Sequence, residues 1–362
     1  MHYNFRVDKD IKKAETLPSK FYMDQSIFDL VKEKIFSKSW HWIGHENLVK
    51  EPNSIHPITL MENFLDEPIL LTKDNNGVIS CLSNVCTHRG NILALNSTKA
   101  KKLVCMYHGR RFNLNGHFEF MPEFEEAKNF PRECDNLFNF PIEKWGPFLF
   151  MGIDPQYDIK KIIKKINTRV GFLPLDDFLL REDLRKDYIV DANWALYCDN
   201  YLEGFHIPFV HEDLNKELDY GDYDTEIYDY FNVQVGYTND SSIAFDFPKN
   251  HMDSGKNIAA YYFWIFPNMM FNFYPWGLSI NIVKPISVNK TKVSFIPYVY
   301  DSNKLDSGAG SILDKVEKED EFVVQNVQRG MRSNYYDTGR FSPIREKGVH
   351  HFHLLVSDFL NK

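Results

Sequence analysis

Residues 86–90 read Cys-Thr-His-Arg-Gly, and residues 105–109 read Cys-Met-Tyr-His-Gly. Each stretch pairs one cysteine with one histidine and has a glycine shortly after the histidine. Glycine supplies the backbone dihedral angles that a chain needs to fold tightly over a metal centre. Two thiolates and two imidazoles suit either a tetrahedral zinc ion or a mixed-ligand iron–sulfur cluster.

The way these ligands are paired distinguishes the two kinds of site. Structural zinc sites usually pair like ligands, as in Cys-x-x-Cys or His-x-x-x-His. In a Rieske [2Fe–2S] cluster, two cysteines hold one iron and two histidines hold the other. The mixed pairs here predict that Cys86, His88, Cys105 and His108 bind such a cluster. A zinc-stabilised binding protein and a simple Rieske-type electron carrier are the alternatives.

The sequence around this motif predicts an all-β module. Short apolar runs, such as residues 68–72 and 78–81, are separated by turn residues such as those at 74–77. We expect the module to cover residues 39–155. The remaining cysteines, Cys81, Cys134 and Cys198, match no ligand position and are predicted to be small core residues.

A second set of candidate ligands follows the module. His206 and His211 can both reach one metal if the chain leaves the helix between them, and Pro208 is expected to force that departure. Two histidines and one carboxylate on one face of Fe(II) leave positions open for O₂ and substrate. A histidine pair alone is weak evidence for a metal site, but it becomes far more specific when it follows a cluster motif in the same chain.

Both motifs resemble those of the Rieske non-heme iron ring-hydroxylating oxygenase α subunits. The resemblance implies that His206 and His211 are iron ligands. The family's third ligand is an Asp on a C-terminal helix, and Asp320 matches it best, with Glu319 and Glu321 as rivals.

One departure from the family pattern lies beside the cluster motif. The family commonly has Trp after the second His-Gly, where this sequence has Arg110. We therefore expect an unusual surface around the cluster, where Arg110 would help to select the electron donor.

Glu203 occupies the position of a carboxylate that bridges the two metal centres in the family. A carboxylate can accept an N–H from a cluster histidine and from an iron histidine, which suggests an electron relay His108–Glu203–His206. In the family the short path crosses to a neighbouring subunit, so a homotrimer is implied. Glu at this position favours the branch that contains choline, carnitine and glycine-betaine monooxygenases.

The resemblance implies an α+β fold with two domains. The all-β Rieske domain, residues 39–155, is followed by a helix-grip-like catalytic domain with a central antiparallel β-sheet, formed by residues 1–38 and 156–362. The pattern of apolar residues predicts helices over residues 1–38 (with Ser26 as a cap), 159–166 and 311–332 and at the C-terminus, and strands over 228–300.

The implied activity is that of a terminal oxygenase. An NAD(P)H-dependent reductase or a ferredoxin would supply electrons, and O₂ and a small organic substrate would meet at a mononuclear Fe(II). The aromatic stretch at 261–276 can enclose a trimethylammonium group or a flat ring. We expect oxidation of an N-methyl carbon or of a carbon beside such a nitrogen, with ring hydroxylation of an aromatic acid as the alternative.

Composition limits the kinds of partner and the cell compartment that we expect for this protein. The net charge of −8 argues against nucleic-acid binding, and five cysteines in 362 residues do not form a secreted disulfide framework. Prolines and asparagines interrupt the apolar run at 258–283, so we predict strands there and no membrane partner. The expected compartment is the cytoplasm. Three further histidines, His350, His351 and His353, are expected to be polar residues of the C-terminal helix.

Overall fold

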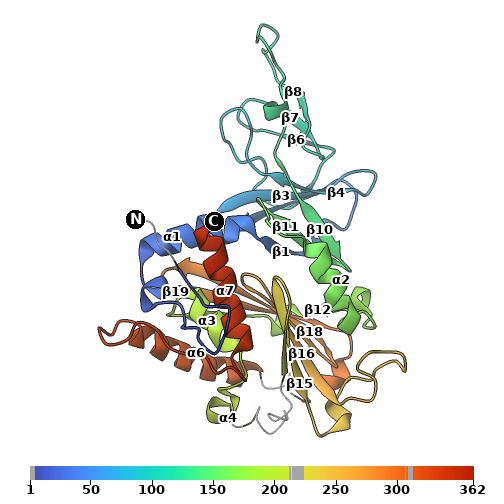
Figure 1. Ribbon diagram of the computed structural model, residues 1–362. Coiled ribbons are helices and arrows are strands. Elements are labelled where there is room, and N and C mark those ends of the chain that lie inside the picture. Colours follow the sequence, from blue (N-terminus) through green and yellow to red (C-terminus); the bar gives the residue numbers. More distant parts are fainter. Residues whose placement is uncertain (1–4, 212, 214–223, 306, 309–312) are drawn as a thin grey trace. The chain divides into compact units, whose positions relative to one another are not determined.

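The computed structural model describes residues 5–211, 213, 224–305, 307–308 and 313–362 (Figure 1). The chain divides into two compact units. One is Ser37–Gln156, and the other combines Met1–Phe36 with Tyr157–Lys362. The N-terminal segment therefore folds with the second half of the chain, and the unit between them is an insertion in sequence.

The unit Ser37–Gln156 consists of antiparallel sheets. A five-stranded sheet has the order β5-β2-β3-β4-β9, and two three-stranded sheets have the orders β1-β11-β10 and β6-β7-β8. The strands are β1 Trp40–His45, β2 Ser54–Leu60, β3 Glu67–Lys73, β4 Ile79–Ser83, β5 Thr98–Lys99, β6 Lys102–Val104, β7 Arg111–Asn113, β8 Phe118–Phe120, β9 Asn139–Phe140, β10 Ile142–Trp145 and β11 Phe148–Gly152.

The apolar core of this unit includes two of the motif's cysteines. Cys86 and Cys105 are buried in one cluster with Leu82 and Phe112, among others. Of the cysteines predicted to be core residues, Cys81 and Cys198 are buried and Cys134 is exposed. The prediction for Cys134 is wrong because this residue lies in a short 3-10 turn at the surface, Glu133–Asp135.

The second unit is built on an eight-stranded antiparallel sheet. Its order is β12-β19-β18-β17-β16-β15-β14, and β13 also pairs with β19. The strands are β12 Leu179–Leu180, β13 Lys186–Val190, β14 Asp224–Ile227, β15 Phe231–Tyr237, β16 Ile258–Ile265, β17 Met269–Tyr274, β18 Gly277–Ser287 and β19 Lys290–Val299.

The aromatic run at 258–283 forms β16, β17 and part of β18, as predicted, with Pro267 and Pro275 in the turns between strands. Proline is tolerated there because a turn needs no ladder hydrogen bond from it. No helix in the described parts of the chain is long and apolar enough to cross a membrane.

Helices pack against this sheet and against each other (Figure 1). They are α1 Gln25–Lys34, α2 Ile159–Val170, α3 Trp194–Tyr201, α4 Ile207–Val210, α6 Leu313–Gly330 and α7 Lys347–Asn361. Helix α3 contacts β18 and α6, and α6 also contacts β13. The helices predicted near 159–166, 311–332 and the C-terminus are present, although Ser311 lies outside the described residues. The predicted α+β class is confirmed.

The prediction for the N-terminal region is wrong in part. Only α1 is an α-helix there, and its cap is Asp24, whose carboxylate accepts a hydrogen bond from Ser26 N at 2.9 Å. Upstream of it the chain bonds to distant segments. Leu17 N donates to His353 Nδ1 at 3.0 Å, and Thr16 N donates to Gly339 O at 3.0 Å. These tertiary hydrogen bonds replace the local ones that a helix would need.

Candidate metal centres

The two halves of the Cys/His motif form matching loops. Gly90 N donates to Cys86 O at 3.0 Å, and Gly109 N donates to Cys105 O at 2.9 Å. Each cysteine amide in turn donates to the carbonyl five residues further on, at 2.8 Å in both loops. Both glycines have a positive φ, 71° and 75°. A side chain at either position would strain the backbone, because L residues rarely adopt these angles.

The loops bring like side chains together. The thiols of Cys86 and Cys105 hydrogen-bond to each other, and both residues are buried. The rings of His88 and His108 have centroids 4.8 Å apart, and His108 is exposed. Adjacent thiols beside adjacent imidazoles are the donor set of a Rieske cluster, in which each iron takes one like pair. These four residues therefore fit the cluster.

The peptide groups of the second loop favour a thiolate at Cys105. Burial opposes its ionisation, but hydrogen bonds from the backbone of Tyr107 and His108 and from Cys86 lower the pKa of Cys105. Asn91 Nδ2 also donates to its sulfur, at 3.6 Å. Burial raises the pKa of Cys86. A thiolate is the form that binds metal, so the loop supplies the chemistry that a cluster ligand needs.

Arg110 does not lie at a docking surface, which corrects the expectation from the sequence. Its side chain is only 2% exposed and forms an ion pair with Asp135, with Nη2 to Oδ1 at 2.9 Å. The guanidinium also lies over the rings of Phe118 and Phe130, at 4.9 and 5.4 Å from their centroids. The arginine is therefore an internal support of the loop that ends at Gly109.

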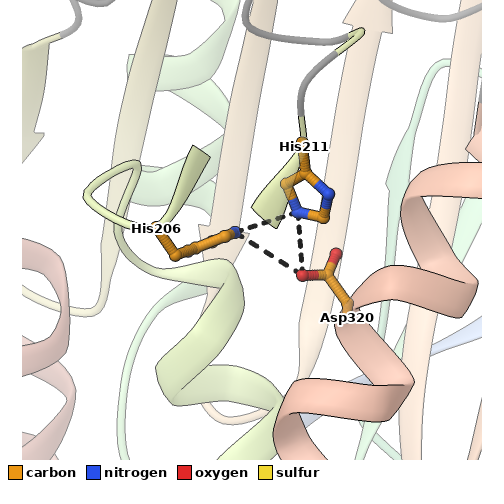
Figure 2. Close-up of side chains that lie close together, drawn as sticks. All are labelled: His206, His211 and Asp320. Carbon is orange, nitrogen blue, oxygen red and sulfur yellow. Dashed lines mark hydrogen bonds and ion pairs between the residues drawn. The ribbon is translucent and has the colours of Figure 1, made fainter. Parts of the chain in front are cut away.

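Figure 2 shows His206, His211 and Asp320 turned toward one another. The Nε2 atoms of the histidines are 3.2 Å apart, and Asp320 Oδ1 lies 3.0 Å from His211 Nε2 and 3.5 Å from His206 Nε2. Among the described residues these three form the group of His, Cys, Asp or Glu side chains that could hold a metal ion. Two imidazoles and one carboxylate make the facial donor set of a non-heme Fe(II) site.

Two further carboxylates fix the orientation of the histidines. His206 Nδ1 bonds to Glu203 Oε1 at 2.7 Å, and His211 Nδ1 bonds to Glu319 Oε2 at 2.8 Å. A carboxylate at Nδ1 selects the tautomer whose Nε2 lone pair is free for a metal. Burial would lower the pKa of His211, yet Asp320 and Glu319 raise it. The site is therefore strongly negative and suited to a divalent cation.

The local structure that positions His206 and His211 differs from the expectation in the role of Pro208. Helix α3 ends at Tyr201, and His206 and His211 flank the short helix α4. Pro208 lies in the first turn of α4, where its missing N–H costs nothing. The histidines are thus joined by one helical turn, with His211 N donating to Ile207 O at 3.0 Å, and Pro208 does not end a helix.

Three carboxylates of α6 were candidates for the third iron ligand, and their contacts distinguish them. Asp320 faces both histidines, whereas Glu319 contacts the far nitrogen of His211. Glu321 makes no hydrogen bond to either histidine. The helix thus turns consecutive side chains to different sides, and Asp320 is the one that joins the group.

A cavity adjoins the three candidate ligands, and the sheet supplies its wall. Gln234 on β15 pairs with Tyr262 on β16, which pairs with Asn272 on β17. Asn281 on β18 pairs with Phe295 on β19. Residues that pair directly across strands share one face of a sheet, and all five line the cavity. The sheet thus presents amides and aromatic rings to the candidate iron site.

The sequence interpretation did not identify several residues of this cavity. Tyr197 from α3 and Glu317 from α6 line it together with the sheet residues. Glu317 lies one helical turn before Asp320, so helical spacing could have indicated it. Of the aromatic stretch at 261–276, Tyr262 and Tyr274 reach the cavity, and most other rings pack in the core.

The histidines of α7 have other partners. His353 bonds to Asp199 Oδ1 at 2.9 Å, and His350 bonds to Asp8 O at 2.7 Å. His351 lies 3.3 Å from Asp229 O. All three are buried, polar members of the C-terminal helix, as expected.

Two family models match the chain. Residues 39–131 match the Rieske [2Fe-2S] domain, and residues 177–362 match the ring hydroxylating alpha subunit (catalytic domain). A chloroplastic choline monooxygenase of Arabidopsis thaliana is 30% identical over 96% of this chain and 83% of its own length. The carnitine monooxygenase oxygenase subunit of Escherichia coli K12 is 26% identical over 96% of this chain and 94% of its own.

Solved structures show the same fold. A quaternary ammonium Rieske monooxygenase in complex with the substrate L-carnitine superposes with a TM-score of 0.75 over 97% of both chains, at 23% identity. A naphthalene 1,2-dioxygenase with indole in its active site superposes with a TM-score of 0.74 over 100% of this chain and 95% of the other, at 16% identity.

Proposed function

Because the chain belongs to the Rieske-type ring-hydroxylating oxygenase α-subunit family, we propose that it hydroxylates a quaternary ammonium compound. The family assigns it a Rieske [2Fe–2S] cluster, a mononuclear non-heme iron and the role of a terminal oxygenase. The observation that supports the substrate class is the juxtaposition of His206, His211 and Asp320 with a cavity walled by tyrosine and phenylalanine rings.

We assign the ligands as follows. Cys86 and Cys105 hold one iron of the cluster, and His88 and His108 hold the other. His206, His211 and Asp320 hold the mononuclear iron. When bound, this iron supplies the coordination and reduction of O₂. Overall, O₂, two electrons, two protons and a substrate C–H give a C–OH group and one water.

The chain's own groups prepare the site for this chemistry. Glu203 and Glu319 hold the two imidazoles in the ligand tautomer. Tyr262 and Tyr274 form an aromatic wall, with ring centroids 5.9 Å apart at 80°. The faces of such rings attract a quaternary ammonium ion, which no hydrogen-bond acceptor can bind directly. The bound cation would leave its oxidised carbon near the iron site.

Glu203 is also the proposed link to the cluster. Its bond to His206 forms half of the relay His108–Glu203–His206, and the exposed His108 is free to approach a neighbouring chain. We propose a homotrimer in which the relay crosses between subunits, fed by an NAD(P)H-dependent reductase or a ferredoxin in the cytoplasm. Glu203→Gln protein that has been loaded with both metals should reoxidise its reduced cluster slowly. Full turnover by that variant would contradict the relay.

Product analysis tests the substrate class. The oxygenase is combined with a reductase, NADH and O₂, and is offered choline, carnitine, glycine betaine and a set of aromatic acids. The proposal predicts oxygen-dependent formation of an aldehyde from a quaternary ammonium compound. Hydroxylated aromatic acid without oxidation of any ammonium compound would contradict it.

A further inference from the structure

One acidic side chain in the cavity has no role in holding either histidine. Glu317 is 2% exposed and lines the cavity one helical turn before Asp320. Its Oε2 accepts a hydrogen bond from Tyr197 OH at 2.5 Å. Its Oε1 has no hydrogen-bond partner in the described structure. A buried carboxyl oxygen without a partner is costly, so this atom needs an explanation from function.

The described side chains that line the cavity offer Glu317 no positive charge. No lysine or arginine is among the described residues that line the cavity. Burial raises the pKa of Glu317 well above its ordinary value, opposed by the bond from Tyr197 and reinforced by the charges of Asp320 and Glu321. A cation that entered the cavity would stabilise the ionised form and supply the missing counter-charge.

We propose that Glu317 is the counter-charge for a substrate cation and that the preferred substrate is an ammonium alcohol, without a carboxylate. This inference rests on the proposed function, since it specifies which quaternary ammonium compounds the site accepts. The aromatic rings would surround the methyl groups, and Glu317 would neutralise the charge of the cation.

The charge of the cavity argues against a zwitterion. Glu203 and Glu317 line it beside the candidate iron ligand Asp320, and no described lysine or arginine of the cavity would pair with the carboxylate of a betaine. Like charges in a poorly solvated site repel strongly. A neutral hydroxyl has suitable donors in the amide NH2 groups of Asn272 and Asn281, whose oxygens already accept hydrogen bonds from Tyr201 and Ser279.

Binding measurements on the fully loaded enzyme test the inference. Anaerobic calorimetry compares the binding of choline with that of two other compounds. One is its uncharged carbon isostere, 3,3-dimethyl-1-butanol (dimethylbutanol below), and the other is the zwitterion glycine betaine. The wild-type enzyme should bind choline at least about tenfold more tightly than either of the other two, as expected for a paired cation in an aromatic site. This comparison needs no variant. Equal binding of choline and dimethylbutanol, or tighter binding of glycine betaine, would overturn the inference.

The variant Glu317→Gln keeps the shape of the side chain and the acceptor for Tyr197. It should weaken choline binding at least about tenfold and leave dimethylbutanol binding within about twofold. Glu321→Gln, on the same helix and outside the cavity, is the matched control and should bind choline as the wild type does. Visible cluster absorption and iron content confirm that both variants are loaded. Unchanged choline binding by Glu317→Gln would refute the role of Glu317.

The result also separates this inference from the proposed function. Preference for glycine betaine or carnitine over choline would leave a quaternary ammonium oxygenase and refute the preference for an ammonium alcohol. If none of the three compounds binds and only aromatic acids are oxidised, the proposed function itself fails.

Discussion

Arg110 and Asp135 form an ion pair inside the Rieske unit, with side chains 2% and 7% exposed. Removing one partner of a buried pair leaves the other charge unpaired, which typically destabilises a protein by about 3–5 kcal/mol. We therefore expect Asp135→Ala to lower the thermal midpoint of this unit strongly. Loss of the visible cluster absorption on heating measures that midpoint.

The matched control for this pair removes both charges. In Arg110→Met/Asp135→Ala, no charge stays buried, and the phenylalanine rings around Arg110 can pack on the methionine. The double variant should recover much of the stability lost in Asp135→Ala. A double variant as unstable as the single one would show that Asp135 acts through its bond to Arg132 N instead.

His351 provides a pH-dependent contribution to stability. Burial lowers the pKa of His351 to about 4. Its folded-state pKa is below the unfolded value, so the unfolded chain binds the proton first as the pH falls. The contribution of neutral His351 to the free energy of unfolding is therefore fully present above a pH of about 6.5. It is lost between that pH and about 4, and the loss is about 3 kcal/mol at most. Urea unfolding at pH 7.5 and 5.0, compared with His351→Gln, measures this slope. An equal slope in the variant would contradict the assignment.

At the scale of the element, helix α6 gives three neighbouring carboxylates different roles at the candidate iron site. Asp320→Ala should abolish binding of the mononuclear iron, since one of three protein ligands is lost. Glu319→Gln keeps all three ligands and weakens the support of His211, so affinity should fall about 10- to 100-fold. Glu321→Gln should leave affinity unchanged. Metal analysis after titration with a chelator measures all three, and loss of iron from Glu321→Gln would contradict this order.

The same helix shows how far the sequence predicts the site. The motif at 203–211 is local in sequence, so His206 and His211 could be predicted as candidate ligands without the fold, whereas Asp320 was predicted from the family resemblance. Glu317 was missed because its burial depends on the packing of α6 against α3. The amides Asn272 and Asn281 were missed because only the register of β17 and β18 shows which face they share. Contacts between distant segments also moved Arg110 from the expected surface into the core.

At the scale of the whole molecule, the sequence pattern changes near residue 154, close to the end of the compact unit Ser37–Gln156. What local patterns could not show is how the N-terminal segment returns to the second unit, through hydrogen bonds such as Leu17 N to His353. That long-range link places the Rieske motif in an insertion, held at both ends by one catalytic unit. His108 is an exposed residue of this insertion.

The proposed electron path between subunits predicts complementation of two inactive variants. Cys86→Ala removes the cluster and retains the iron site, and Asp320→Ala does the reverse. The two variants are coexpressed with different tags, and the mixed trimers are purified. In these trimers, a subunit that holds a cluster lies beside a neighbour that holds iron. A mixed ring of three with one directional path per interface has one productive interface, which gives about a third of wild-type turnover. Either variant alone should be inactive. A path confined to one chain would leave the mixed trimers inactive as well, and light scattering confirms that they have formed.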